Sequence, residues 1–362
     1  MSERPVNFNP GPAILPLEVL EKASKALVAL DGVGLSVAEI SHRSKEFEAI
    51  NADAMGRVRR LFHVPDTHDV LFLQGGASGQ FAQIPLNFLG KDQVGAYVLS
   101  GAWSKKALEE AKRLGAAVSI ASSEDKNFSE LPSLDGGAVP GNAAYVHTTS
   151  NNTIFGTQWP ELPEFPGHRH VCDMSSDIFS RPVEAAKFAL IYAGAQKNAG
   201  PSGVTIVIIE KAWMASAPKT IPTIWRYQTH ADNQSLYNTP PSFGVYLVGL
   251  TLAWIEEQGG LEAMAKLNDA KAKLLYDAID GSGGFYRGSV TNKAHRSRMN
   301  VTFLLPSEDL EKKFAKESEA AGLIGLKGHR SVGGMRASIY NAMPMAGVER
   351  LVAFMEKFRK AS

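Results

Sequence analysis

The sequence of 362 residues contains a single cysteine, Cys172. One thiol cannot form an internal disulfide, and it cannot supply the several thiolates of a cysteine-built zinc site. Long apolar runs are also missing, since the longest are strand-sized and fall far below the ~20 residues that a membrane-spanning helix needs. The first residues, 1–7, lack the apolar core of a secretory signal. These absences predict a cytoplasmic protein without membrane contact.

An excess of charge of either sign is missing as well. The chain has 38 Lys+Arg and 37 Asp+Glu, which leaves a net charge of +1. No global field therefore recruits nucleic acid or an anionic membrane. His168 and His170 have no third metal ligand nearby, so we predict no metal site. The length leaves room for a large domain and a smaller one.

The first chemical signal is a glycine-rich turn between a strand and a helix. The apolar run Asp69–Leu73 predicts a buried strand, residues 74–79 form the turn, and helical spacing follows from Gln80. Backbone N–H groups and the positive end of a helix converge in such a turn and bind anions. Neither a Walker A motif nor G-x-G-x-x-G fits these residues. The turn therefore suits one phosphate group better than a dinucleotide, although it could also be only a turn.

Three further polar or aromatic residues follow predicted strands. Trp103 comes after the strand Gly95–Leu99, and its indole could stack on a ligand ring or belong to the core. Thr153 lies in a loop rich in hydroxyl and amide groups after a third strand. Asp173 ends a short apolar run at the edge of the sheet where open α/β proteins bind ligands. Its carboxylate could pair with a protonated ring nitrogen, or it could cap a helix.

Lys197 lies in a turn of small residues between two apolar runs, 188–192 and 204–209, which predict buried strands. An apolar surround favours the neutral amine, the form that attacks a carbonyl to give a Schiff base. A surface lysine on a hairpin turn is the alternative. However, pyridoxal phosphate requires four features of a protein: a phosphate cup, a stacking face, an acid partner for its ring nitrogen and a lysine. The sequence offers all four, in this order.

The rest of the chain predicts the domain plan. Residues 1–16 form an extended, proline-rich segment over the surface, 17–259 a large α/β cofactor-binding domain, and 260–362 a smaller α+β domain. Residues 116–140 are polar and predict an irregular connection. In the smaller domain Arg336, Arg330 and His329 stand close together in the sequence, and arginine forks match carboxylate and phosphate groups.

Six stretches make the sequence resemble the phosphoserine aminotransferase family: residues 8–13, 41–47, 74–81, 192–198, 237–242 and 328–342. The resemblance runs from residue 8 to about residue 346. It implies a class-V, fold-type I transferase with a large mixed-sheet α/β domain and a smaller C-terminal α+β domain. It also implies pyridoxal 5'-phosphate as the cofactor and a homodimer as the assembly.

The resemblance further implies a role for each site residue. Lys197 and Asp173 would be catalytic, with Lys197 bonded to the cofactor and Asp173 paired with its ring nitrogen. The other cofactor contacts would be Ala77, Ser78, Trp103, Thr153 and Gln196, with Asn238 and Thr239 reaching over from the partner subunit. The substrate would be held by His42, Arg43, His329, Arg330 and Arg336, of which Arg336 would bind the α-carboxylate. Some family members carry arginine where this chain has Ser78, so a substrate contact from that arginine is absent here.

The implied reaction transfers the amino group of L-glutamate to 3-phosphohydroxypyruvate, giving O-phospho-L-serine and 2-oxoglutarate in serine biosynthesis. The 4-phosphooxy-threonine pair of pyridoxine biosynthesis is a related substrate. Two alternatives are a fold-type I aminotransferase for another small molecule and a noncatalytic phosphometabolite-binding protein. A cysteine desulfurase is disfavoured, because Cys172 adjoins Asp173 on a strand and so faces the opposite side.

Overall fold

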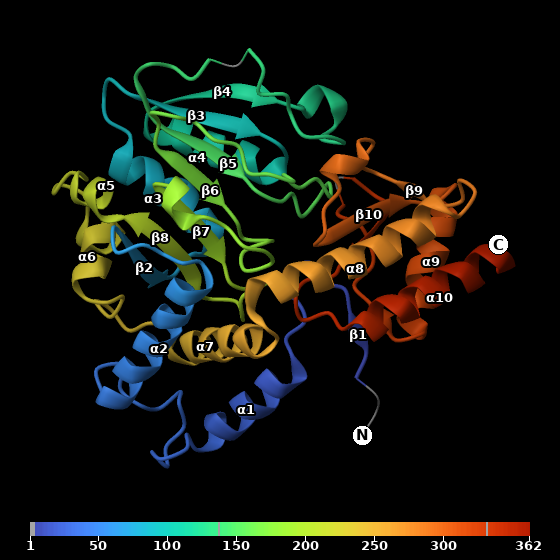
Figure 1. The fold of residues 1–362 in the computed structure, drawn as a ribbon, viewed down its shortest axis with the longest axis horizontal. Helices are drawn as coiled ribbons and strands as arrows, with labels where there is room; N and C mark the ends of the chain where they lie inside the picture. The colour runs from blue at the N-terminus through green and yellow to red at the C-terminus, as the bar shows by residue number, and fades with distance from the viewer. Residues whose placement is uncertain (1–3, 137, 331) are drawn as a thin grey trace.

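The computed structural model describes residues 4–136, 138–330 and 332–362, and it is built around one seven-stranded sheet (Figure 1). The strand order is β2-β8-β7-β6-β5-β3-β4, and β8 alone runs antiparallel to its neighbours. The predicted mixed α/β fold is therefore confirmed. The strands are β2 His68–Leu73, β3 Val94–Leu99, β4 Ala116–Ser122, β5 Ala143–Thr149, β6 His170–Asp173, β7 Leu190–Gly194 and β8 Thr205–Glu210.

Helices cover both faces of this sheet, because its strands carry apolar side chains on both sides. One face packs against α2 and α7, and Cys172 belongs to that core. The other packs against α3 and α4, together with Tyr97, Tyr145 and Tyr192. The helices of this part are α1 Leu17–Val28, α2 Lys45–Leu61, α3 Gly76–Phe88, α4 Ala102–Leu114, α5 Lys211–Ala215, α6 Tyr227–Asp232 and α7 Ser242–Glu257, with 3-10 turns at 124–126, 185–187 and 223–225.

The proposed domain boundary at residue 260 falls at the start of α8 Gly260–Asp280. Beyond it lie a three-stranded sheet of order β12-β10-β9 and two helices that pack on it (Figure 1). Their bounds are β9 Arg287–Gly288, β10 Asn300–Leu304, α9 Glu308–Ala320, β11 Leu323–Ile324, β12 Met335–Ser338 and α10 Met345–Ala361, with a 3-10 turn at 293–295. Ser307 begins α9 by accepting a hydrogen bond from Leu310 N at 3.3 Å, a standard N-cap.

Two sequence-based expectations differ from the structure. Residues 116–122, expected to be irregular, form β4 at the edge of the large sheet. An edge strand is partly exposed and tolerates the polar residues that suggested a loop. The N-terminal segment is extended as expected, but it does not run over the surface: β1 Val6–Asn7 pairs with β11, and Phe8 is fully buried in the C-terminal core.

Within the described residues, no helix combines the length and the apolar character needed to cross a membrane.

Candidate active site

The candidate catalytic residues meet at one edge of the large sheet. The six strands that run in the same direction all end there, and the polypeptide continues from them into the loops that carry the predicted residues. Asp173 is the last residue of β6, and Lys197 follows β7 by three residues. Lys197 Nζ donates to Thr153 Oγ1 at 2.8 Å. The structure therefore brings together residues from three neighbouring strand ends.

Lys197 is partly buried, and its surroundings lower the pKa of its amine. Burial lowers the pKa of its amine to about 8; Asp173 opposes this shift and Arg336 adds to it. A lower pKa gives a larger share of neutral amine near neutral pH, which is the nucleophilic form. The neighbouring N-terminal segment packs closely here, and Ala13 N donates to Gln196 O at 2.9 Å. Lys197 therefore suits attack on a carbonyl carbon, as its sequence context predicted.

Asp173 is buried, and its carboxylate has a fixed orientation. Its Oδ1 accepts hydrogen bonds from Ser175 N at 2.9 Å and Ser175 Oγ at 2.6 Å. Burial raises the pKa of Asp173, and the positive charge of Lys197 opposes that rise. The backbone bond is a turn cap rather than an α-helix cap, because no α-helix follows β6 directly. A cationic ring nitrogen at this position would favour the ionised carboxylate.

The glycine-rich turn has the backbone shape of an anion cup. Gly75 and Gly76 have φ of 92° and 63°, a left-handed conformation that side-chain-bearing residues rarely adopt. The chain then enters α3, and its first N–H groups, which include those of Ala77 and Ser78, have no acceptor within the helix. Ala77 is partly buried and Ser78 is exposed. These groups could hold a phosphate at the edge of the sheet.

Trp103 lies between two lysines. The centroid of its ring is 5.5 Å from Lys197 Nζ and 4.6 Å from Lys106 Nζ. Its Nε1 is buried and has no hydrogen-bond partner in the described part of the protein. The indole therefore supplies a flat surface beside Lys197, while the cation of Lys106 sits next to it.

A group of cations adjoins this surface. Arg336 on β12 is buried and donates to Thr153 O at 3.2 Å. Its Nε has no partner among the described residues. Burial and the charges of Arg336, Arg330 and Lys106 together lower the pKa of His329. Such a group is complementary to an anion, because neighbouring cations repel one another until an anion fills the space between them.

Four predicted residues have no described hydrogen bond to this group: His42, Arg43, Asn238 and Thr239. Arg43 Nε donates to His42 Nε2 at 3.4 Å, and Arg43 N donates to Ser41 Oγ at 3.2 Å. Within the described ranges, neither His42 nor Arg43 has a described hydrogen bond to His329, Arg330 or Arg336. Thr239 O accepts bonds from Gln74 Nε2 at 3.1 Å and Asn238 Nδ2 at 3.3 Å. The segment of Asn238 and Thr239 thus lies beside Gln74, which directly precedes the glycine turn.

Sequence reasoning missed three residues of this region. Ser175 orients Asp173 and also accepts from Gly194 N at 3.1 Å. A serine two residues after a strand-end aspartate is a turn signal that could have indicated this contact. Lys106 follows Trp103 by three residues on α4, a spacing that places both on one helix face. Asp177 is buried and accepts bonds from Ser150 and Gln158, and only tertiary structure reveals that group.

The described residues contain no group of three or more His, Cys, Asp or Glu side chains that could hold a metal ion.

The fold and the family comparison define the class of the protein. The family model for aminotransferase class-V matches residues 6–351. The chain therefore belongs to the class-V aminotransferases, which are enzymes that depend on pyridoxal phosphate. It is also similar in fold, with a TM-score of 0.75 and 17% identity, to an aspartate aminotransferase from Thermus thermophilus. The fold alone thus does not select a substrate.

Within this class the chain belongs to the phosphoserine aminotransferase family. It is 55% identical over 358 residues to a phosphoserine aminotransferase of Geobacillus kaustophilus, with 99% of both chains covered. It is 56% identical over 352 residues to one of Herpetosiphon aurantiacus, covering 97% of this chain and 98% of the relative. The structure of the enzyme from Bacillus circulans subsp. alkalophilus matches with a TM-score of 0.97 at 54% identity, covering 99% of both chains.

Proposed function

We propose that this aminotransferase moves the amino group of L-glutamate to 3-phosphohydroxypyruvate, which yields O-phospho-L-serine and 2-oxoglutarate. The observation that carries the proposal is the group formed by Arg336, His329, Arg330 and Lys106 beside Lys197. A phosphate and an α-carboxylate are the two anions that such a group accepts. The proposal places the enzyme in serine biosynthesis. The 4-phosphooxy-threonine pair of pyridoxine biosynthesis carries the same two anionic groups and is a second proposed substrate.

The arrangement of the residues fits pyridoxal phosphate. The cup at Gly75 and Gly76 would hold its phosphate, the indole of Trp103 would cover its ring, and Asp173 would pair with the ring nitrogen. Both described hydrogen bonds to the carboxylate of Asp173 reach Oδ1, which leaves Oδ2 for such a partner. Gln196 precedes Lys197 in the sequence, and Thr153 Oγ1 accepts a hydrogen bond from Lys197 Nζ at 2.8 Å. When bound, the cofactor withdraws electrons from the α-carbon of the amino acid.

The chain's own residues then supply orientation and proton transfer. Arg336 would bind the α-carboxylate, and this fixes which face of the amino acid meets Lys197. The neutral Nζ of Lys197 would accept the proton from the α-carbon, and the resulting ammonium would release it again. Asp173, held by Ser175, would keep the ring nitrogen protonated throughout.

A visible absorption spectrum tests the reaction. We expect the protein to be yellow, its band to move when glutamate is added, and the original band to return when 3-phosphohydroxypyruvate follows. Phosphoserine should then be present in an amount equal to the enzyme sites. If neither addition moves the band, the noncatalytic phosphometabolite-binding alternative gains support instead.

We also propose a homodimer in which parts of the site cross between subunits. Ile224, Trp225 and Tyr237 are 40%, 43% and 41% exposed, although they are large apolar side chains. Exposed apolar residues that gather near a functional segment are typical of interfaces. Asn238 and Thr239 directly follow Tyr237, and Arg43 is not joined to its proposed partners within one chain. In the proposal, these residues and His42 therefore serve the site of the neighbouring subunit.

Mixing two impaired variants tests this arrangement. Lys197→Ala and Arg43→Ala should each form poor enzymes with phosphoserine. A mixed dimer contains one site with both native residues, because Lys197 comes from one subunit and Arg43 from the other. Co-refolding equal amounts should therefore raise the activity above the sum of the two parents. Activity equal to that sum, or an active monomer in sedimentation, would contradict the proposed sharing.

Substitutions in the cation group should distinguish the binding of the side-chain phosphate from the binding of the α-carboxylate. Arg330→Ala and Lys106→Ala should lower kcat/KM for phosphoserine more than for glutamate, because they remove charge near the side-chain phosphate. Arg336→Ala should lower both alike, because both amino acids carry the α-carboxylate. Each charge-assisted bond contributes roughly 1.5–3 kcal/mol, so losses of about tenfold to a hundredfold are expected for each variant.

Lys105→Ala is the matched control for Lys106→Ala. Lys105 adjoins Lys106 on α4 but pairs with Glu124. Its removal should leave kcat/KM for phosphoserine and for glutamate unchanged. If Lys105→Ala and Lys106→Ala lower kcat/KM for phosphoserine equally, Lys106 contributes only to the overall positive charge and does not contact the phosphate.

A further inference from the structure

Lys271 on α8 is a fully buried lysine that the reaction described above does not use. Its exposed fraction is 0%. Its Nζ lies within hydrogen-bond distance of four main-chain carbonyl oxygens: those of Tyr340 at 2.7 Å, Ile339 at 3.1 Å, Met343 at 3.1 Å and Asn341 at 3.4 Å. Among the described residues it forms no ion pair. A lysine without a carboxylate partner is rarely buried so completely.

The carbonyls form a site for a cation. Burial lowers the pKa of Lys271 to about 7. Carbonyl oxygens accept hydrogen bonds from the ammonium form more strongly than from the neutral amine. A buried carbonyl oxygen without a donor costs free energy. Residues 339–343 lie between β12 and α10; Met343 N donates to Tyr340 O at 2.9 Å, and Lys271 is the described donor to the carbonyls of Ile339, Asn341 and Met343. The ammonium therefore takes the place of several N–H donors for this segment.

Residues 339–343 connect two functional parts of the active site. They directly follow β12, the strand that carries Arg336. Asn341 N donates to Asn198 Oδ1 at 2.9 Å, and Asn198 is the neighbour of Lys197. Asn341 Nδ2 donates to Phe179 O at 2.8 Å, and Tyr340 Oη donates to Pro10 O at 2.7 Å. The segment thus joins the lysine loop, the N-terminal segment and the strand of the arginine.

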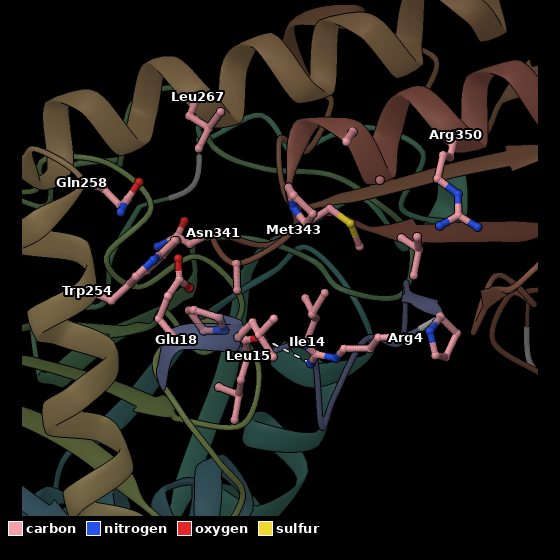
Figure 2. Close-up of a pocket in the computed structure, with 18 residues that line it drawn as sticks. Arg4, Ile14, Leu15, Glu18, Trp254, Gln258, Leu267, Asn341, Met343 and Arg350 are labelled. Atoms are coloured by element: carbon pink, nitrogen blue, oxygen red, sulfur yellow. Dashed lines mark hydrogen bonds between the residues drawn. The ribbon is translucent and has the colours of Figure 1, made fainter. Parts of the chain in front are cut away.

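Residues 339–343 are mostly buried, with Ile339, Tyr340 and Met343 at 0% and Asn341 at 2% exposure. A cavity of about 580 Å³ borders it, lined among others by Asn341, Met343, Leu267 and Trp254 (Figure 2). Side chains on the edge of a cavity have fewer neighbours to restrain them. The bonds to Lys271 add to the core packing and to the hydrogen bonds of Tyr340 and Asn341 in restraining the main chain at this place.

We infer that Lys271 is a positioning residue of the active site, whose buried ammonium fixes residues 339–343 and through them sets the relation between Lys197 and Arg336. The inference rests on the roles proposed for those two residues. Lys271 itself would touch neither substrate nor cofactor. Its loss should loosen the fit of the amino acid rather than remove a reacting group.

Lys271→Met tests the inference, because methionine keeps a long unbranched side chain and removes the charge. We expect KM for glutamate and for phosphoserine to rise alike, by about tenfold to a hundredfold, as for small misplacements of reacting groups. The pH at which the visible band of the holoenzyme titrates should also move, because Asn198 no longer holds the Lys197 loop. Lys273→Met, an exposed position on α8 paired with Asp277, is the matched control and should change neither quantity.

Chemical rescue separates positioning from stability. In Lys271→Ala, n-propylammonium should enter the vacated space and restore KM, whereas the uncharged isostere 1-propanol should not. If Lys271→Ala does not fold, a double-mutant cycle of Lys271→Met with Asn198→Ala replaces it, and strongly nonadditive effects on KM are expected. A lower melting temperature with unchanged KM and unchanged band titration would overturn the inference, as would equal rescue by 1-propanol or additivity in the cycle. Inactivity of the wild type would instead refute the proposed function.

Discussion

Replacing Lys197 by alanine is expected to abolish turnover while the protein still folds and binds pyridoxal phosphate noncovalently. Among the described residues, Lys197 is the lysine that donates to Thr153, and it also lies beside Trp103. Lys106 is the other lysine beside the Trp103 ring, but no hydrogen bond to Thr153 is described for it. One amine supplies both the nucleophile and the proton carrier in the proposed reaction. The loss in kcat should therefore be at least about 10⁴-fold, the upper range for a single acid–base group.

Borohydride reduction followed by peptide mapping checks this assignment. Reduction should fix the cofactor to the peptide that contains Lys197 in the wild type and to no peptide in Lys197→Ala. Lys187→Ala is a suitable control, because Lys187 precedes the same strand but forms exposed ion pairs with Glu164 and Glu184. It should retain full activity. A labelled peptide without Lys197 in the wild type would show that another lysine bonds the cofactor.

Replacing Asp173 by asparagine is expected to slow the reaction with glutamate by about a thousandfold or more, with the fold intact. Asparagine keeps an oxygen that can accept from Ser175 N, so the turn after β6 should persist. It has no negative charge, however, and in a buried site a cationic ring nitrogen without a counter-charge loses its proton. One lost interaction of about 4 kcal/mol corresponds to roughly a thousandfold in rate.

Single-turnover kinetics with glutamate measure the effect of Asp173→Asn directly. The bound cofactor should remain visible, while the rate of its spectral change falls. Ser175→Ala is the graded comparison, because it removes the bond of 2.6 Å but keeps the charge, and it should cost much less. A rate for Asp173→Asn near that of the wild type would remove Asp173 from the proposed role.

The sequence predicted those parts of the candidate site whose residues directly follow a strand with a clear apolar pattern. Apolar runs of strand length predicted β2, β3, β7 and β8 to within about two residues at each end, and they also indicated strands before Thr153 and before Asp173, where β5 and β6 lie. Because these strands are buried on both faces, their patterns are continuous and easy to distinguish from the loops after them. Lys197, Asp173 and Thr153 each follow such a run, so their meeting at one sheet edge was predictable from strand direction alone.

The remainder depends on contacts that no local pattern contains. β4 is an edge strand, and its polar residues resemble a loop. Lys271 looks like any helix lysine in sequence, and only the path of residues 339–343 places four carbonyls around it. In the proposed homodimer, the position of Arg43 relative to Arg330 would depend on how the subunits assemble, which the pattern of one chain does not specify.

The specificity of the wild-type enzyme for phosphoserine over serine tests the central claim most directly. In the proposed function both amino acids would present the same α-carboxylate to Arg336, so the difference in their kcat/KM isolates the side-chain phosphate and the cations around His329. Two partial contacts worth about 4 kcal/mol in total predict that kcat/KM for phosphoserine exceeds that for serine by at least roughly a thousandfold. Equal kcat/KM values for the two would contradict the phosphate-binding role and leave an aminotransferase for a different substrate.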